Sequence, residues 1–594
     1  MSYSNDELRS KRKFQWANNY VITDGVKKVL GKKCRQRDNI YWGGPMWLAV
    51  SSNGKEIANI LENHSSLSNC EILEVPNLNN FTVEYFADKK EGVDALLGLK
   101  DCSFESFSRS FAERVLTKHR VLKKQYGLLM AICMVVGTVV GSGVFFKAQA
   151  ILQKTNGDMP LGILAWIIGG VIMICCVLAF CVMAQRYEKV NGLVDYAEAT
   201  IGSKYGYMMG WFATTIYMPA MTSVLAWLTA RYFLTFLVSV NPDLQLAGDP
   251  VTGTETFLLA GFILICVFAV NTLSSKLAGK LQISATFIKF IPLLLMAIVG
   301  TIYGLTHNLA GEPTSILTSN FATSAGDMSP LFGAVVATAF AYEGWILATS
   351  INSEIKDSKK NLPIALVVGG IIIIAIYLFY YIGVAGGAPV KTLMDEGTAS
   401  AFTTVFGNVL GNILNLFVAV SCLGTLNGLL IGTIRGMYSL SVRNMGPKVD
   451  LMKQVDPASG MPSNSCIVGL VIVAAWLVYF YGANLTATPW FGKFSFDSSE
   501  LPIITIYGLY IPMFIKFMIK EKELPVVKRF VLPALGVIGS AFMVVAAIYS
   551  HGYAPYIAAK EAGAGFSCPV LFYLIVFVVI MAIGALVMKP KKKA

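Results

Sequence analysis

Charged residues are scarce in this chain. Asp, Glu, Lys and Arg make up 14% of its 594 residues, whereas hydrophobic residues make up 55%. Soluble domains have about 25% charged and about 45–50% apolar residues. With a mean hydropathy of +0.59, the composition excludes an ordinary soluble protein and indicates a polytopic membrane protein.

The residue patterns of metal sites and of most active sites are missing as well. The chain has only four histidines, none near another, and its eleven cysteines form no C-x-x-C pair. Cys175 and Cys176, neighbours in an apolar segment, are expected to act as small buried hydrophobic residues. There is no phosphate-binding loop and no nucleophile-and-base pattern. We therefore expect no metal site, no cofactor and no enzymatic activity.

Long apolar segments follow one another from Lys124 onward. Twelve of them reach the length of about 20 residues that a helix needs to cross a bilayer. The sequence thus predicts an all-α polytopic membrane protein with twelve transmembrane helices, in contact with the lipid bilayer. The predicted spans lie roughly at 126–152, 161–185, 206–238, 255–273, 277–305, 330–353, 362–387, 411–441, 464–481, 498–518, 530–550 and 569–588.

The distribution of positive charge predicts the orientation of these helices. If the N-terminus is inside, the internal connectors carry 16 Lys and Arg residues and the external connectors carry four. Since cytoplasmic loops are enriched in Lys and Arg, we expect a multi-pass protein of the cell membrane with both termini in the cytoplasm. The net charge of +12 is then a signal of topology, and no nucleic-acid partner is expected.

Residues 1–123 precede the apolar segments and are predicted to form a small soluble α/β domain on the cytoplasmic side. Met46–Val50 and Cys70–Val75 are typical of strands, and Gly54–Asn63 is typical of a helix. The six basic residues of Lys27–Arg37 suit anionic lipid headgroups better than nucleic acid. The sequence does not indicate what this domain does.

The first apolar segment contains a cluster of small residues, Gly137–Phe145. Its three glycines and one serine disfavour a helix, because each glycine costs about 1 kcal/mol relative to alanine. In a membrane, the unpaired N–H and C=O groups of an unwound turn are tolerated only where they face protein or a water-filled cavity. N–H groups at the start of the following half-helix favour an anion such as a carboxylate. This break is therefore a candidate binding site.

The sixth apolar segment contains a second interruption, Phe340–Trp345. It places Glu343 and Gly344 at mid-span, where a charge costs about 2.5 kcal/mol or more. Each interruption lies in the first helix of a group of five, as in the inverted repeats of secondary transporters. The pattern predicts a substrate site between the two broken helices. The alternative is that the glycines serve only close helix packing.

Four segments of the chain resemble the amino acid-polyamine-organocation (APC) permeases. Val136–Phe145 is similar to the first helix of that family, Phe340–Trp345 to the sixth, and Glu354–Pro363 to the loop that follows. Ser421–Gly428, with Arg435, is similar to the eighth helix of its L-type amino acid transporter-like bacterial branch. The resemblance implies the leucine-transporter fold for residues 124–594, with 5+5 inverted helices and two more appended, and alternating access to a central amino acid site.

The first break is expected to bind the carboxylate of the amino acid. Ser142 and Gly143, with Gly141, would donate main-chain and hydroxyl hydrogen bonds at the positive end of the second half-helix. Holding a carboxylate and an ammonium group without water, and then releasing them, is the only chemistry required.

The sixth helix is expected to bind the ammonium group. The family suggests main-chain carbonyl acceptors around Phe340, Ala341 and Glu343, next to Gly344, and Phe340 as a gate over the substrate. Glu343 replaces the small residue common at the matching position of the L-type branch. Its acid could pair with a cationic substrate side chain, take part in proton coupling, or bond within the protein, and the sequence leaves these three open.

Lys289 lies midway along the fifth predicted span, far from either surface. It matches a lysine that in APC permeases takes the place of a sodium ion, and this resemblance implies sodium-independent transport. A buried ammonium group can lose its proton, so Lys289 is a candidate for proton coupling. A fixed structural cation is the alternative.

We therefore predict a sodium-independent amino acid permease that works by proton symport or by amino acid exchange. A sensor that binds an amino acid and signals through residues 1–123 is the alternative. The sequence identifies neither the amino acid, nor the oligomeric state, nor any partner subunit.

Overall fold

The computed structural model divides into two compact units, Met1–Lys123 and Lys124–Ala594, which are described separately. It describes the backbone of five strands in the first unit and residues 127–588 of the second. Within 127–588 the residues not described are 188–191, 242, 245, 247, 274–276, 278–280, 282–283, 286, 310, 312, 323–325, 346–354, 356 and 457–460.

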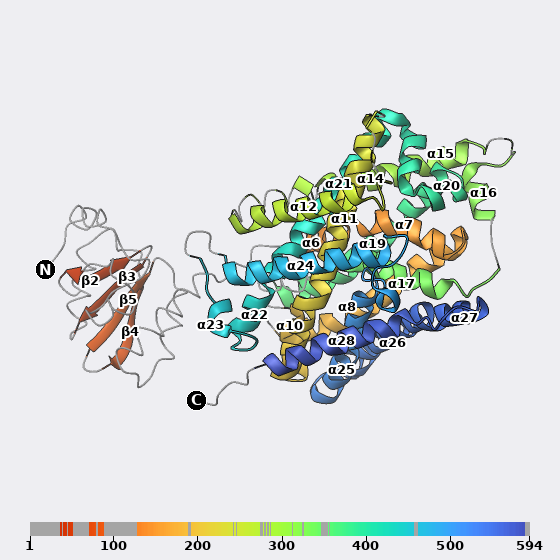
Figure 1. The fold of residues 1–594 in the computed structure, drawn as a ribbon. Coiled ribbons are helices and arrows are strands. Elements are labelled where there is room, and N and C mark those ends of the chain that lie inside the picture. Colours follow the sequence, from red (N-terminus) through yellow and green to blue (C-terminus); the bar gives the residue numbers. More distant parts are fainter. Residues whose placement is uncertain are drawn as a thin grey trace. The chain divides into compact units, whose positions relative to one another are not determined.

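The described part of the first unit is one antiparallel sheet with the strand order β1-β2-β3-β5-β4 (Figure 1). The strands are β1 (Gln36–Arg37), β2 (Ile40–Gly43), β3 (Met46–Ser51), β4 (Glu71–Leu78) and β5 (Phe81–Ala87). The two strands expected from the sequence coincide with β3 and β4, which are rich in β-branched and aromatic residues. The expected helix Gly54–Asn63 lies outside the described residues, so the α/β class of this unit stays a prediction.

The second unit is built from helices (Figure 1). Its first half contains α6 (Leu128–Val139), α7 (Gly143–Lys154), α8 (Met159–Arg186), α9 (Gly192–Thr200), α10 (Ser203–Phe212), η3 (Ala213–Tyr217), α11 (Met218–Val240), α12 (Thr254–Leu273), α14 (Phe290–Leu295), η4 (Met296–Gly300), α15 (Thr301–Thr306) and α16 (Ile316–Ala322). Its second half contains α17 (Leu331–Tyr342), α19 (Ser358–Gly387), α20 (Val390–Asp395), α21 (Thr398–Ile434), α22 (Gly436–Val442), α23 (Val449–Met452), α24 (Ser463–Asn484), η6 (Gly492–Phe494), α25 (Leu501–Lys520), η7 (Val527–Val531), α26 (Leu532–Ile548), η8 (Tyr549–Tyr553), α27 (Ala554–Glu561) and α28 (Pro569–Val587).

Within the described residues, nine continuous helical segments are long and apolar enough to cross a membrane. They correspond to nine of the twelve predicted spans. Three shorter apolar helices, Leu128–Gly137, Phe290–Thr306 and Leu331–Tyr342, cover parts of the first, fifth and sixth predicted spans. The multi-pass architecture is thereby confirmed, whereas the count of twelve and the inverted repeat stay predictions.

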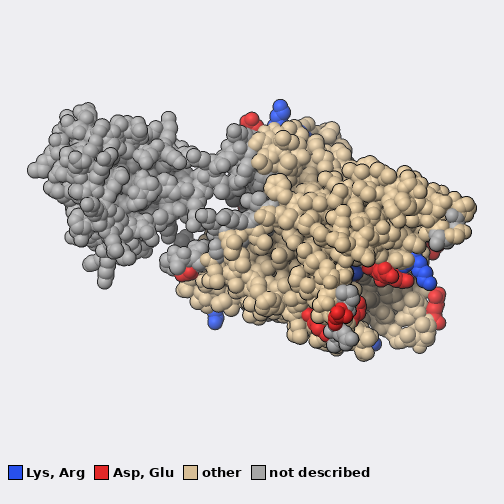
Figure 2. Space-filling model, turned by 90° about the horizontal axis from the view of Figure 1, so that it is seen from above, with Lys and Arg blue, Asp and Glu red and all other residues tan. Residues whose placement is uncertain are grey.

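The outer faces of these helices suit a lipid solvent. Leu258, Phe262 and Ile265 of α12 are each more than half exposed, and their spacing of four and three residues places them on one face. Only 11% of α28 is buried inside the unit. On the face shown in Figure 2, charged side chains are few among the described residues.

The helices around the first break pack closely. α17 contacts α7 and α8, α19 contacts α6 and α8, and α11 contacts α21. α19 also lies directly on the π-helical turn η4: a Cβ atom on Gly386 would lie 2.2 Å from the carbonyl oxygen of Gly300. Backbones can approach this closely only where side chains are absent. α21 consists of two helices that meet at Gly407, whose backbone is not helical (φ 75°, ψ 170°), and the predicted start of the eighth span at residue 411 lies just after this bend.

Candidate functional site

The first predicted break is present. α6 ends at Val139, Val140 is extended (φ −64°, ψ 111°), and α7 begins at Gly143 with Ser142 as its N-terminal capping residue. The break falls in the glycine cluster because helix formation is weakest there. The first N–H groups of α7 have no partner within that helix, so an anion can bind them.

The second predicted break is present as well. α17 ends at Tyr342, Glu343 is extended (φ −73°, ψ 158°), and Gly344 has a φ of +106°. Only glycine adopts such a φ without strain, which explains why the helix stops here. Glu343 is thus held at the end of a half-helix and is 9% exposed.

The two breaks touch each other. A Cβ atom on Gly143 would lie 2.6 Å from the Cα atom of Ala341, so the first turn of α7 packs on the last turn of α17. The Tyr377 hydroxyl of α19 lies 3.1 Å from the Val139 carbonyl and 2.9 Å from the Ala341 carbonyl, and it donates to these acceptors. One fully buried phenol therefore links the carbonyl groups that the two breaks release.

A cavity of about 280 Å³ lies beside the breaks. Gly141, Ser142 and Gly143 of the first break line it, as do three of the four candidates in the sixth helix. Ala341 does not, and its carbonyl accepts from Tyr377 instead of facing the cavity. The full lining is Gly137, Val139, Gly141, Ser142, Gly143, Tyr217, Met221, Leu225, Lys289, Phe340, Glu343, Gly344, Thr425, Gly428, Leu429 and Ile431.

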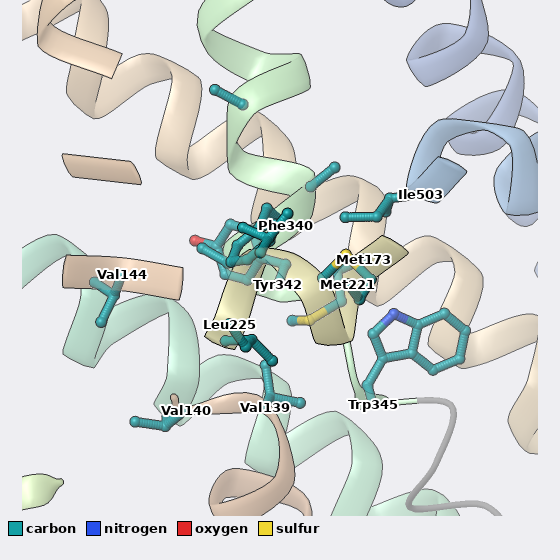
Figure 3. Packing of buried hydrophobic residues seen from close by; sticks show 14 of the residues in the cluster. Val139, Val140, Val144, Met173, Met221, Leu225, Phe340, Tyr342, Trp345 and Ile503 are labelled. Carbon is teal, nitrogen blue, oxygen red and sulfur yellow. The ribbon is translucent and has the colours of Figure 1, made fainter. Parts of the chain in front are cut away.

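The remaining walls come from α11 and α21. Met221 and Leu225 of α11 lie near Val139 and Phe340 (Figure 3). Thr425 of α21 is close enough that a Cβ atom on Gly141 would lie 2.8 Å from its hydroxyl oxygen. These wall residues are apolar or small, so the polar groups concentrate at the breaks.

Glu343 is bound by one side chain. The Tyr217 hydroxyl in the π-helical turn η3 donates to its Oε1 over 2.5 Å. Among the described residues, Glu343 forms no ion pair at 4 Å or less. A buried carboxylate that lacks a cation is costly unless a proton or a cationic group neutralises it. The bond to Tyr217 shows that bonding within the protein is one of its roles.

Lys289 reaches the same cavity from the fifth span. Its ammonium group is buried and donates to the Gly137 carbonyl in the last turn of α6. The lysine therefore provides a hydrogen-bond donor to a carbonyl group close to the first break. No group of three His, Cys, Asp or Glu side chains that could hold a metal ion occurs in the described part of the chain.

Phe340 forms a roof over the cavity. Its ring packs edge-on against Phe146, with 5.8 Å between ring centroids, and Phe146 packs in the same way on Trp227 at 5.6 Å. The Lys147 ammonium group lies 5.3 Å from the Phe340 centroid. Phe340 is 5% exposed and lines the cavity, and its role as a gate stays a prediction.

Sequence reasoning missed several groups at this site. Tyr217 and Tyr377 come from helices whose patterns show only that they are apolar, and Thr425 lies within the eighth-helix motif Ser421–Gly428 but was not singled out as a site residue. A tyrosine in an apolar segment indicates a buried hydroxyl that needs a partner, but the sequence does not name that partner. Arg435, part of the eighth-helix motif, is exposed and donates to the Met461 sulfur at 3.5 Å, away from the cavity.

Comparison with known proteins gives a family and several relatives. The family model for amino acid permeases matches residues 126–583. The serine/threonine exchanger SteT of Bacillus subtilis is 28% identical over 437 residues, which are 72% of this chain and 92% of SteT. The mouse b(0,+)-type amino acid transporter 1 is 23% identical over 431 residues, 72% of this chain and 84% of its own length. The human cystine/glutamate transporter is 22% identical over 444 residues, 73% and 82% respectively.

The residues matched by the family model include most of the second unit, both helix breaks and every residue that lines the cavity. The family and the relatives are transporters and not enzymes, as the sequence predicts, and they give no support to the alternative of a sensor. The chain therefore belongs to the amino acid permease family.

Proposed function

We propose that this permease carries an amino acid across the cell membrane by alternating access, with the substrate held between the two helix breaks. The observation that carries the proposal is the cavity, because it collects the predicted carboxylate-binding and gate residues from helices far apart in sequence. In this arrangement, N–H groups of Ser142 and Gly143 bind the substrate carboxylate at the positive end of α7.

The ammonium group of the substrate binds at the other break. The end of α17 supplies main-chain carbonyl acceptors there, around Phe340 and Glu343, and the negative charge of Glu343 adds to their attraction. Because the Ala341 carbonyl is bonded to Tyr377, its role is to hold the two breaks together. Phe340 then opens and closes the path above the substrate.

Glu343 also determines which positive charge enters the site together with the amino and carboxylate groups of the substrate. Its carboxylate is buried and faces the cavity, and it can be neutralised by the side chain of a cationic amino acid or by a proton. In the first case lysine and arginine are preferred substrates. In the second case a proton accompanies a neutral substrate.

Transport is proposed to be independent of sodium. The Lys289 ammonium group already occupies the space next to the Gly137 carbonyl, and a second cation there would be repelled. Exchange is the favoured mode, because SteT is named as an exchanger, and proton symport is the alternative. The excess of basic connectors on one side supports cytoplasmic termini, with residues 1–123 as a cytoplasmic domain of unassigned role.

Uptake of radiolabelled amino acids into proteoliposomes tests this proposal. The full chain is reconstituted with either a preloaded amino acid or an imposed proton gradient. Uptake that needs internal amino acid indicates exchange, and uptake that follows the proton gradient indicates symport. The proposal is wrong if no amino acid moves under any gradient.

Two glycine variants provide a matched pair for the site. Gly143→Ala places a methyl group 2.6 Å from the Ala341 Cα atom, whereas Gly261→Ala on α12 meets nothing within 4 Å. Gly143→Ala is expected to abolish uptake, since the two breaks must separate, and Gly261→Ala is expected to keep it. Equal uptake by both variants would contradict a substrate site between the breaks.

A further inference from the structure

A buried ion cluster that the transport cycle described above does not use lies at the N-terminal end of α25. Glu500 Oε1 lies 2.8 Å from Lys147 Nζ, and Oε2 lies 3.0 Å from Lys154 Nζ and 2.9 Å from His551 Nε2. We call these four residues the Glu500 cluster. The Glu500 side chain is 1% exposed and that of Lys147 is 2% exposed, so bulk water screens the charges of this pair little, whereas the Lys154 side chain is 30% exposed.

The cluster joins three helices that are separate in sequence. Both lysines belong to α7, Glu500 directly precedes α25, and His551 lies in η8. α7 is the half-helix whose first turn lines the cavity, so anything that holds α7 also holds the carboxylate-binding N–H groups. The Lys147 ammonium group in addition lies 4.8 Å from the ring centroid of Phe146 and 5.3 Å from that of Phe340. The cluster is thus continuous with the roof of the cavity.

Few other ionisable groups face His551. The helices packed against η8 include α17, α26 and α28, which contain no charged residue, and α27, whose Lys560 and Glu561 are exposed. On the side of α25, Asp497 accepts hydrogen bonds from Ser499, whose hydroxyl lies 3.2 Å from Lys147 Nζ. In the part of the chain that the structure describes, the charged groups nearest His551 are therefore Glu500 and the two lysines bound to it, with Asp497 connected to Lys147 through Ser499.

Two donors from different helices converge on one oxygen atom of Glu500. Lys154 and His551 both donate to Oε2 of Glu500. A neutral histidine donates this bond without adding charge. A protonated histidine binds Glu500 more strongly and repels both ammonium groups of α7, and histidine is the side chain that ordinarily changes charge between about pH 5 and 8.

We propose that the Glu500 cluster is a pH-sensitive latch on α7, in which protonation of His551 transfers Glu500 from the lysines to the histidine and lets the α7 half-helix move away from α25. By releasing α7 from α25, the latch would allow the cavity to open beside the C-terminal end of α7. This step rests on the proposed alternating access. A low pH on the side of the membrane where the Glu500 cluster lies then favours the state in which α7 and α25 are apart.

The distance between α7 and α25 can be measured directly in the full chain. Spin labels are placed at Asn156→Cys, after α7, and Lys493→Cys, before α25, since both side chains are exposed. The native cysteines are replaced, and the protein is kept in lipid nanodiscs. Lowering the pH from about 7.5 to about 5.5, across the range in which histidine titrates, is expected to raise the population of the longer distance about threefold or more.

Three variants decide whether His551 causes this response. His551→Gln keeps a donor but cannot be protonated, and it is expected to lose the response. Glu500→Gln removes the shared negative charge while His551 stays in place, and it is also expected to lose the response. His307→Gln changes an exposed histidine after α15 that is stacked on Tyr303, and it is expected to keep the response.

The latch is overturned if the wild-type distance does not change with pH, or if His551→Gln responds as the wild type does. This readout needs no transport. A chain that moves no amino acid but shows the response supports the latch and contradicts the proposed function, whereas transport without the response does the reverse.

Discussion

The two ends of α25 carry the same residue type in different surroundings. At the N-terminal end, Glu500 is 1% exposed and has three cationic or hydrogen-bonding partners on α7 and η8. At the C-terminal end, Glu521 lies 2.7 Å from Arg186 Nε and 2.6 Å from the Tyr187 hydroxyl. The Arg186 side chain is 43% exposed and also reaches Glu523, which is 80% exposed. α25 has 20 residues, so these ends are about 30 Å apart.

Glu500 and Glu521 also differ in the helix to which each of them binds. Glu521, whose side chain is 6% exposed, binds the end of α8, a continuous helix of 28 residues, through Arg186, which is 43% exposed. Glu500 binds α7, the half-helix that follows the first break, and its closest cation, Lys147, is 2% exposed. An unwound turn cannot fix the position of α7 by itself, because its hydrogen bonds are missing. A buried, charge-compensated contact can fix it, and it can release it when one charge changes.

Breaking the buried cluster should have the largest effect on stability. Lys147→Met leaves the Glu500 carboxylate without its closest cation, and loss of one partner of a buried pair costs about 3–5 kcal/mol. We expect a clear fall of the thermal unfolding midpoint of the purified protein in detergent. The double variant Lys147→Met/Glu500→Leu should recover much of the loss, since the charge that it leaves without a partner, that of Lys154, is on a side chain 30% exposed to solvent. A double variant as unstable as Lys147→Met would contradict this account.

Weakening the contacts of Glu521, at the C-terminal end of α25, should lower the stability of the protein less. Glu521→Gln keeps the shape and an acceptor for Tyr187 but removes the charge, which should cost about 1 kcal/mol. Because Arg186 is partly exposed, salt of about 1 M should reduce the difference from the wild type. The measurement is the unfolding midpoint at low and high salt. A loss equal to that of Lys147→Met would mean that burial does not distinguish the two ends.

The smallest effect is expected at Glu523. Its side chain is mostly in water, and exposed ion pairs contribute little to stability. Glu523→Gln should therefore leave the unfolding midpoint and the uptake unchanged within error. A measurable loss would show that Arg186 depends on Glu523, and the contrast between the ends of α25 would then be weaker.

Some features of the site were predictable because they are local. The break at Gly141–Gly143 follows from the low helix propensity of glycine, and the break at Glu343–Gly344 follows from a charge and a flexible residue at mid-span. Both breaks are present at these positions. The predicted spans likewise follow from runs of apolar residues, and the predicted start of the eighth span at residue 411 lies just after the bend at Gly407 that divides α21.

Other features depend on contacts between distant parts of the chain. His551 was one isolated histidine in the sequence, and Lys147 is 353 residues away from the glutamate that it binds. Tyr377 shows no pattern that assigns it to the carbonyl groups of both breaks. Glu343 had three open roles, and its bond to Tyr217 became visible only in the folded chain.

The sequence by itself determined that the chain crosses a membrane, that two of its helices are interrupted, and which residues flank the interruptions. Composition, apolar run length and glycine propensity act over a few turns of helix, so they can be read along the chain. Only the tertiary structure decided which groups bond to Glu343, Lys289 and Glu500 and which residues hold α7. Pairing between buried polar groups is set by the packing of helices hundreds of residues apart, and no local pattern records it.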